Sequence, residues 1–230
     1  MATRPHASKP MTADGPFRYR IRFAKSAPLR FIGHLDLHRT WERTLRRAGA
    51  QLAYSEGYNP RPRLNLGLAL PLGCTSQGDL LDVILEASWE SEDLCQALHK
   101  AAPPGLIVEA VWPVPPGTPP LQREVSSCEY QVDLETAAAP AGLQEAVQRL
   151  LSSDSLPRER RGKSYDLRPL IERLTLETGE PAERPRLVMQ LAAREGATGR
   201  PEEVLLELGL DPLAHVPHRA RVLGPSVEPG

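Results

Sequence analysis

Apolar and polar residues alternate along residues 17–25, and this period of two predicts a half-buried β-strand. One face of the strand carries apolar side chains and the other carries three arginines, Arg18, Arg20 and Arg22. Residues 59–70 alternate in the same way, with prolines and leucines on one parity and polar side chains on the other, namely Asn59, Arg61, Arg63 and Asn65. We therefore expect two strands that each present a row of arginines on the face away from the core.

The apolar period changes to that of a helix in residues 34–48. Leu37, Trp41 and Leu45 recur every four residues, which places them on one helical face. Gly49 follows directly, as glycine often does at the end of a helix. Residues 91–102 predict a second helix, because serine and acidic residues at its start are typical of a helix N-terminus.

The remaining segments give an order of elements that occurs twice. Setting aside a short strand at 51–54, the first 113 residues contain strands at 17–25, 62–70, 79–87 and 106–112 and the two helices above. This β-α-β-β-α-β order is typical of a ferredoxin-like unit. The proline-rich residues 113–125 predict a connector, since proline cannot serve a central strand. Beyond it the same order returns, with strands at 128–135, 169–177, 185–193 and 218–223 and helices at 141–151 and 200–209.

The expected fold is therefore α+β, with two tandem ferredoxin-like βαββαβ units. We place a disordered leader at 1–16, the first unit at 17–113, the connector at 114–126 and the second unit at 127–224. A chain of 230 residues and 25.3 kDa, with 40% hydrophobic and 25% charged residues, is large enough to bury two such cores.

The charge is distributed unevenly along the chain. The formal net charge is only −1, so the whole chain lacks the basic signature of a nucleic-acid-binding protein. Residues 17–65, however, contain eleven lysines and arginines against three acidic residues, a surplus of eight positive charges. Such a local surplus indicates an anionic partner for this segment.

Several classes of function are excluded at the level of motifs. The three cysteines are far apart and form no CxxC or CxxxCxxC spacing, so we expect no cofactor in this chain and cysteines kept reduced. No GxSxG motif, P-loop or GxGxxG motif occurs, which favours a binding protein over an enzyme. No apolar run approaches the length of a membrane span and no signal peptide precedes residue 17, so we expect a cytoplasmic protein that contacts no membrane.

Three interpretations of the arginine rows stay open. The first is a structural ladder, in which Asp82 and Glu86 on a neighbouring strand pair with the arginines. The second is a clamp for an anion such as the RNA backbone, with tyrosines as stacking surfaces. The third is a docking edge for another protein. The candidate anion-binding residues are Arg20, Arg22, His34, Arg39, Arg43, Arg46, Arg47, Tyr58, Asn59, Arg61, Arg63 and Arg168.

Two further clusters each allow a structural and a functional interpretation. His34 and His38 are four residues apart with Asp36 between them, a spacing that could hold a metal ion on one helical face. No recognised metal motif surrounds them, so we favour core or capping histidines and expect no metal. The basic residues 157–169 predict a solvated loop. Arg168 in that loop could instead extend an anion-binding groove between the two units.

The chain resembles a family of uncharacterised bacterial proteins that are linked to radical SAM enzymes, whose domain occurs alone or fused to a cobalamin-binding radical SAM enzyme. The matching motifs are the RYRIRF strand, the helix entry F-x-G-H-L-D-L at 31–37 and the loop Y-S-x-G-Y-N-P-x-P-R-L at 54–64. Weaker matches occur at 166–169 and 200–210.

This resemblance implies a radical SAM enzyme as a partner, because the chain itself lacks the CxxxCxxC motif that binds a radical SAM cluster. Our leading hypothesis is a non-catalytic accessory module that binds an anionic substrate such as RNA. The first alternative is a protein–protein adaptor that docks the radical SAM partner. The second is a metal-dependent enzyme that uses His34 and Asp36.

Overall fold

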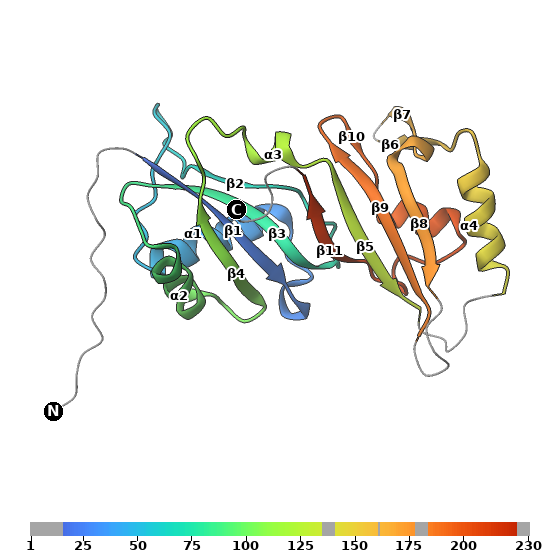
Figure 1. The fold of residues 1–230 in the computed structure, drawn as a ribbon, viewed down its shortest axis with the longest axis horizontal. Helices are drawn as coiled ribbons and strands as arrows, with labels where there is room; N and C mark the ends of the chain where they lie inside the picture. The colour runs from blue at the N-terminus through green and yellow to red at the C-terminus, as the bar shows by residue number, and fades with distance from the viewer. Residues whose placement is uncertain (1–15, 135–140, 161, 178–183, 225–230) are drawn as a thin grey trace.

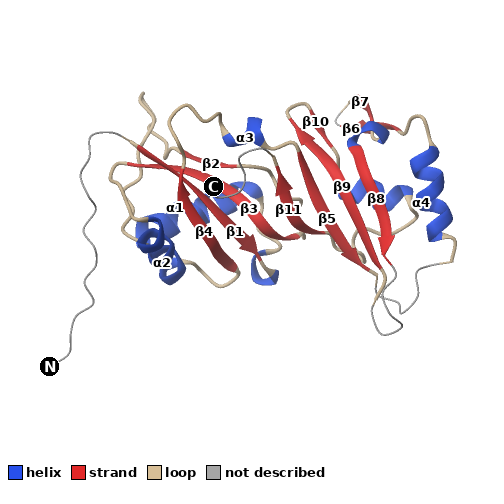
Figure 2. Ribbon diagram, viewed as in Figure 1, coloured by secondary structure: helices blue, strands red, loops and turns tan. Residues whose placement is uncertain are grey.

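The computed structural model describes residues 16–134, 141–160, 162–177 and 184–224. These residues form a mixed α+β fold with a large, mostly antiparallel sheet that runs the length of the molecule, and helices pack against it (Figures 1 and 2). The predicted leader lies outside the described residues except for its last residue, Pro16. In the described part of the chain, no helix is long and apolar enough to cross a membrane.

The first half of the chain supplies four strands and two long helices. In chain order these are β1 (Phe17–Lys25), α1 (His34–Arg47), β2 (Leu64–Leu66), β3 (Thr75–Leu85), α2 (Ser91–Ala101) and β4 (Leu106–Pro113), with a short 3-10 helix at Ala27–Leu29. The strands lie side by side in the order β4-β1-β3-β2, and every neighbouring pair is antiparallel.

The second half begins with the short helix α3 (Leu121–Glu124) and repeats this order of strands. Its elements are β5 (Ser127–Asp133), α4 (Leu143–Ser152), β6 (Pro157–Arg160), β7 (Lys163–Asp166), a 3-10 helix at Arg168–Leu170, β8 (Ile171–Glu177), β9 (Arg186–Arg194), β10 (Ala197–Thr198), α5 (Pro201–Glu207) and β11 (His218–Leu223). Strands β11, β5, β9 and β8 lie side by side in that order and are antiparallel.

Strand β11 joins the two halves into one nine-stranded sheet. It pairs with β5 along its length and also lies parallel to the start of β3, where His218 and Arg219 are opposite Thr75 and Ser76. The buried ion pair between Arg219 and Asp79, 2.7 Å apart, crosses the same junction. The two halves therefore share a continuous backbone ladder.

The apolar face of β1 packs against the helices, as the alternation of residues 17–25 predicts. Ile21 and Phe23 are buried with Trp41 of α1, and the rings of Phe23 and Trp41 meet edge to face with centroids 5.0 Å apart. A second core lies beneath α4 and α5, where Val147 and Val204 pack with Met189 of β9. Leu80 of β3, in the first half, also belongs to this second core, so the core extends across the junction between the halves.

The predicted strand at 62–70 is wrong at both ends, since only Leu64–Leu66 pair along β3. Before β2, Pro60 and Pro62 have no N–H with which to extend the ladder. The predicted loop at 157–169 is also wrong, because most of it forms the β6–β7 hairpin. Its polar side chains gave no apolar period from which the two strands could be recognised.

The connector covers the sheet face that a ferredoxin-like unit would leave open. Arg18 donates to the carbonyl oxygens of Thr118 and Pro119, both at 2.7 Å. Leu121 of α3 lies against Gly67, so the polypeptide after β4 folds back across β1 and β3. Arg18 and Arg20 on this face of β1 therefore have partners within the protein.

Candidate functional site

The structure divides the predicted anion-binding residues into a buried group and an exposed group. Arg20 belongs to the buried group, with a relative exposure of 1% and ion pairs to Asp82 at 2.7 Å and Glu124 at 2.6 Å. Burial alone would lower the pKa of Arg20, but these carboxylates raise it, so the guanidinium remains charged. Asp82 also binds Arg18, which is the structural ladder that the sequence allowed.

Arg22 and Arg168 are half-buried and also have partners within the protein. The Arg22 guanidinium lies 3.6 Å from the Glu109 carboxylate. Arg168 donates to the carbonyl oxygens of Leu151 at 2.9 Å and Ile171 at 3.1 Å, which joins the end of α4 to the start of β8. Both partners of Arg168 lie in the second half of the chain, as Arg168 itself does.

The exposed group includes a row of arginines along α1. Arg39, Arg43 and Arg47 are four residues apart and lie on one helical face. Arg39 pairs with Asp36 at 3.3 Å, whereas Arg43 and Arg47 form no ion pair with any described residue. The row therefore ends at the C-terminus of α1 with two uncompensated positive charges.

Arg46 points to a different neighbour. Its guanidinium lies 2.8 Å from Glu42 and donates to the Tyr54 hydroxyl at 2.6 Å, so it holds α1 against the segment that precedes β2. Those two partners raise its pKa. Arg46 is consequently more constrained than Arg43 and Arg47.

The loop at residues 55–61 carries the other exposed candidates. Tyr58 is fully exposed, and Asn59 and Arg61 are exposed beside it. The loop closes through Ser55, whose N–H and hydroxyl bond to the backbone of Arg61. After the loop, Asn65 is opposite Asp82 on the sheet face away from α1, and the alternation places Arg63 on that face as well. The predicted set therefore occupies two faces rather than one continuous patch.

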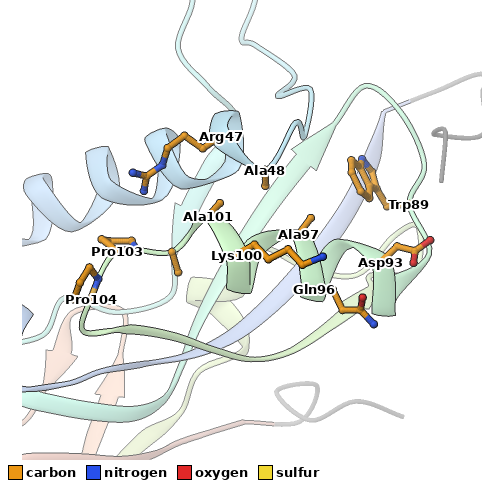
Figure 3. Close-up of a pocket in the computed structure, with 11 residues that line it drawn as sticks. Arg47, Ala48, Trp89, Asp93, Gln96, Ala97, Lys100, Ala101, Pro103 and Pro104 are labelled. Atoms are coloured by element: carbon orange, nitrogen blue, oxygen red, sulfur yellow. The ribbon is translucent and has the colours of Figure 1, made fainter. Parts of the chain in front are cut away.

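A groove between α1 and α2 receives the end of the arginine row. It has a volume of about 790 Å³, which is within the range of ligand-binding pockets. Arg47 enters it from the last turn of α1, and Asp93, Gln96 and Lys100 rise from successive turns of α2 (Figure 3). Lys100, like Arg47, forms no ion pair with a described residue, so the charged lining of the groove carries a net positive charge.

Trp89 lies at the opposite end of this groove from Pro103 and Pro104 (Figure 3). The Tyr19 hydroxyl accepts a hydrogen bond from the Trp89 N–H at 2.7 Å and donates to the Trp89 carbonyl at 2.8 Å. The half-buried indole also packs against the core of the first half. The two hydrogen bonds fix the backbone of Trp89, and packing against the core holds its ring, so the indole can serve as a stacking surface.

Sequence reasoning missed Trp89 and Lys100 because each stands outside the basic segment at residues 17–65. The one available signal was the predicted second helix: Trp89 immediately precedes its N-cap residue, Glu90, and Lys100 lies in the last turn of the helix. That they line one groove with Arg47 depends on the packing of α1 against α2, which no local pattern specifies.

The histidines of α1 differ in their environments. The ring Nε2 of His38 lies 3.2 Å from the Leu64 carbonyl oxygen, an interaction in which the nitrogen donates. Partial burial and the nearby His38 and Arg219 lower the pKa of His34. No group of three or more His, Cys, Asp or Glu side chains in the described residues could hold a metal ion. The metal-enzyme alternative therefore stays a prediction without support from this geometry.

Comparison with known proteins gives one match to a family. A model of uncharacterised proteins conserved in bacteria, DUF2344, matches residues 18–201. No curated protein matches the chain. Among solved structures, the chain is similar to an unknown protein from Galdieria sulphuraria, with a TM-score of 0.25, 14% identity, and coverage of 85% of this chain and 88% of that one. It is also similar to a protein described as a "putative glycine cleavage system transcriptional repressor", with a TM-score of 0.23, 10% identity, and coverage of 84% and 86%.

Proposed function

The chain belongs to the DUF2344 family of uncharacterised bacterial proteins, and we propose that it is a non-catalytic module that binds single-stranded RNA in the groove between α1 and α2. One observation carries this proposal. Arg47 and Lys100, two cations without a carboxylate partner among the described residues, line the same groove as a rigid, half-exposed indole, that of Trp89.

The chemistry of the groove suits a nucleotide chain. Proteins that bind single strands combine cations that contact the phosphates with aromatic rings on which bases stack. Here Arg43 and Arg47 would follow the backbone along α1, Lys100 would hold a phosphate from the α2 side, and Trp89 would stack one base. Arg61 and Arg63 on the separate loop would contact the strand only where it leaves the groove.

The fold proposal is that the two halves are tandem ferredoxin-like units. It is supported by the strand orders β4-β1-β3-β2 and β11-β5-β9-β8: when the four named strands of each half are numbered along the chain, both orders are 4-1-3-2. The two long helices of the first half pack on one face of its strands, as in that fold. The groove is then the space between the two helices of the first unit.

Fluorescence anisotropy with a labelled single-stranded RNA at about 50 and 200 mM salt tests the RNA proposal, because the binding of phosphates weakens with salt over this range. Replacing Arg43 and Arg47 by glutamine should weaken binding and reduce the slope of log K against log salt by about 0.7 for each phosphate that the protein no longer neutralises. Replacing Trp89 by leucine should cost about 1–3 kcal/mol of binding free energy with little change in that slope.

Matched variants elsewhere separate a site from general electrostatics. The double variant Arg123→Gln/Arg194→Gln removes two exposed arginines outside the groove, and Trp112→Leu removes another half-buried indole. Equal losses in these variants and in the groove variants would refute the groove as the site. Arg61→Ser/Arg63→Ser measures the contribution of the loop, which should be smaller than that of Arg43 and Arg47 together.

Docking of a partner enzyme is the second candidate function, and exposed apolar side chains favour it. Phe31, Leu35 and Leu72 are 67%, 72% and 68% exposed, and the hydrogen bond from the Gly73 N–H to the Arg30 carbonyl brings their two segments together. The family resemblance makes a radical SAM enzyme the proposed partner. Co-purification with such an enzyme should resist RNase and vary little with salt, and loss of the complex on RNase treatment would contradict it.

A further inference from the structure

A second hollow opens at the junction between the two halves of the sheet, and we call it the seam pocket. Its volume is about 430 Å³, and strands from both halves line it with the polar side chains Arg22, Gln77, Glu109, Gln131, His218 and Arg221. Arg22 is on the face of β1 opposite Phe23, which packs on Trp41 of α1. The seam pocket is therefore separate from the groove between α1 and α2.

Three irregularities of the sheet meet at this pocket. Arg22 is opposite Ala110 and Phe23 is opposite Val108, so Glu109 is an extra residue in β4. In β3, Gln77 and Gly78 are together opposite a single residue of β1, and Gly78 has a φ of +70°. In β11, Ala220 is extra between the paired Arg219 and Arg221. All of these extra residues line the pocket. Such β-bulges occur preferentially beside active sites, where they redirect a side chain.

The lining provides donors suited to an oxyanion. Arg22 is 3.6 Å from Glu109, whose carboxylate also accepts the Gly78 N–H. Arg221 is 3.9 Å from Glu129, but its side chain is 70% exposed, so most of its five N–H donors are available to a ligand. Gln77 and Gln131 add neutral amide donors. Cationic and amide N–H groups together are the usual partners of carboxylates and phosphates.

His218 is held in a fixed orientation at the wall of the pocket. Its Nδ1 lies 2.8 Å from the Thr75 hydroxyl, which leaves Nε2 as the nitrogen available to a ligand. Burial lowers the pKa of His218, so the ring is neutral at neutral pH. When Nδ1 accepts the Thr75 O–H, the neutral ring carries its proton on Nε2, which can then donate one hydrogen bond to an oxyanion in the pocket.

We propose that the seam pocket binds one small metabolite through an oxyanion, a carboxylate or a phosphate, held between Arg22 and Arg221 and contacted by His218. The volume is near the lower end of the range for ligand sites, which fits a single small molecule and not a polymer. Because its lining comes from β1, β3, β4, β5 and β11, a bound ligand would bridge the two halves of the sheet.

NMR of the His218 imidazole in the full chain tests this inference, with the signal assigned through His218→Gln. Malonate and inorganic phosphate are titrated separately against sodium chloride at matched ionic strength, and comparison of the two shows which oxyanion the pocket takes. We expect a saturable shift that Arg22→Gln/Arg221→Gln weakens about tenfold, the scale of a missing charge-assisted hydrogen bond. The control Arg123→Gln/Arg194→Gln should leave the shift unchanged.

The absence of saturation with both probes, or equal affinity in the double variant, would overturn the inference. Arg221→Gln alone keeps the test valid if the double variant does not fold, because that side chain is mostly exposed. RNA binding should be unaffected by these seam variants. Failure of the seam proposal can therefore be told apart from failure of the RNA proposal.

Discussion

Asp82 is the residue whose neutralisation should destabilise the first half most. Its carboxylate is buried, with 4% exposure, and accepts hydrogen bonds from Arg18 at 2.5 Å and from Arg20 at 2.7 Å. The change Asp82→Asn keeps the shape of the side chain and removes the negative charge. The buried Arg20 then keeps only one of its two carboxylate partners, Glu124.

The expected cost follows from the burial of these charges. Removing one partner of a buried ion pair typically costs about 3–5 kcal/mol, because a charge is left out of water without compensation. With Glu124 still beside Arg20, we expect a cost toward the lower end of that range. The exposed pair of Asp36 and Arg39, with side chains 62% and 68% exposed, is the matched control. Breaking that pair by Asp36→Asn should cost no more than about 1 kcal/mol. The buried change would remove a large part of the roughly 5–15 kcal/mol that stabilises a typical domain.

Equilibrium unfolding in urea measures both changes as shifts in midpoint at constant m value. The reasoning predicts a difference of at least about 2 kcal/mol between Asp82→Asn and Asp36→Asn. Equal stabilities would refute it, and would mean that water or a rearranged connector compensates the Arg20 charge. Glu124→Gln provides a second test from the other side of the same guanidinium, and should also cost several times more than Asp36→Asn.

Three further predictions concern single residues. Gly105→Ala should lower the melting temperature more than Gly49→Ala. Both glycines have positive φ, at +92° and +81°, so both changes strain the backbone. A Cβ on Gly105 would also meet a carbon of Leu29 at 2.9 Å, whereas a Cβ on Gly49 would face open space. Iodoacetamide at about pH 8 should label Cys95 in the folded protein and Cys128 only after unfolding, as mass spectrometry would show, because burial raises the pKa of Cys128 to about 11. Two backbone N–H donors lower the pKa of Asp166 in the folded protein. The ionised carboxylate therefore stabilises the fold above its unfolded-state pKa, and this stabilisation is lost as the pH falls through its folded-state pKa. In urea unfolding, the loss of stability caused by Asp166→Asn should accordingly be constant near neutral pH and become smaller in acid.

Local patterns were sufficient for the elements that build the first core. The alternation of β1 and the four-residue stripe of α1 both reflect burial on one face, and the buried residues Ile21, Phe23, Leu37, Trp41 and Leu45 are the ones those periods select. Such signals depend only on near neighbours in the chain, so a single sequence contains them in full.

The junction between the two halves of the sheet could not be predicted in the same way. β11 pairs with β3 through only two residue pairs, and the residues concerned are separated by most of the chain. The buried Arg219 reads as an ordinary polar strand residue until Asp79 is placed 2.7 Å from it. Bulges at Glu109 and Ala220 likewise arise from pairing with a partner strand, so no period along one strand reveals them.

The arginines show why pattern alone could not rank their roles. Arg20 and Arg47 both occupy regular positions of a strand or helix, and both are flanked by other basic residues. Arg20 is neutralised by Glu124, which arrives on the folded-back connector, whereas no described carboxylate reaches Arg47. An ion-paired, buried guanidinium contributes to stability, and an unpaired, exposed one in a groove that is also lined by an indole is available to a ligand. The functional assignment therefore depends on where distant acidic residues fold, and for that reason the groove at Arg47, rather than the strand at Arg20, is the place to look for RNA.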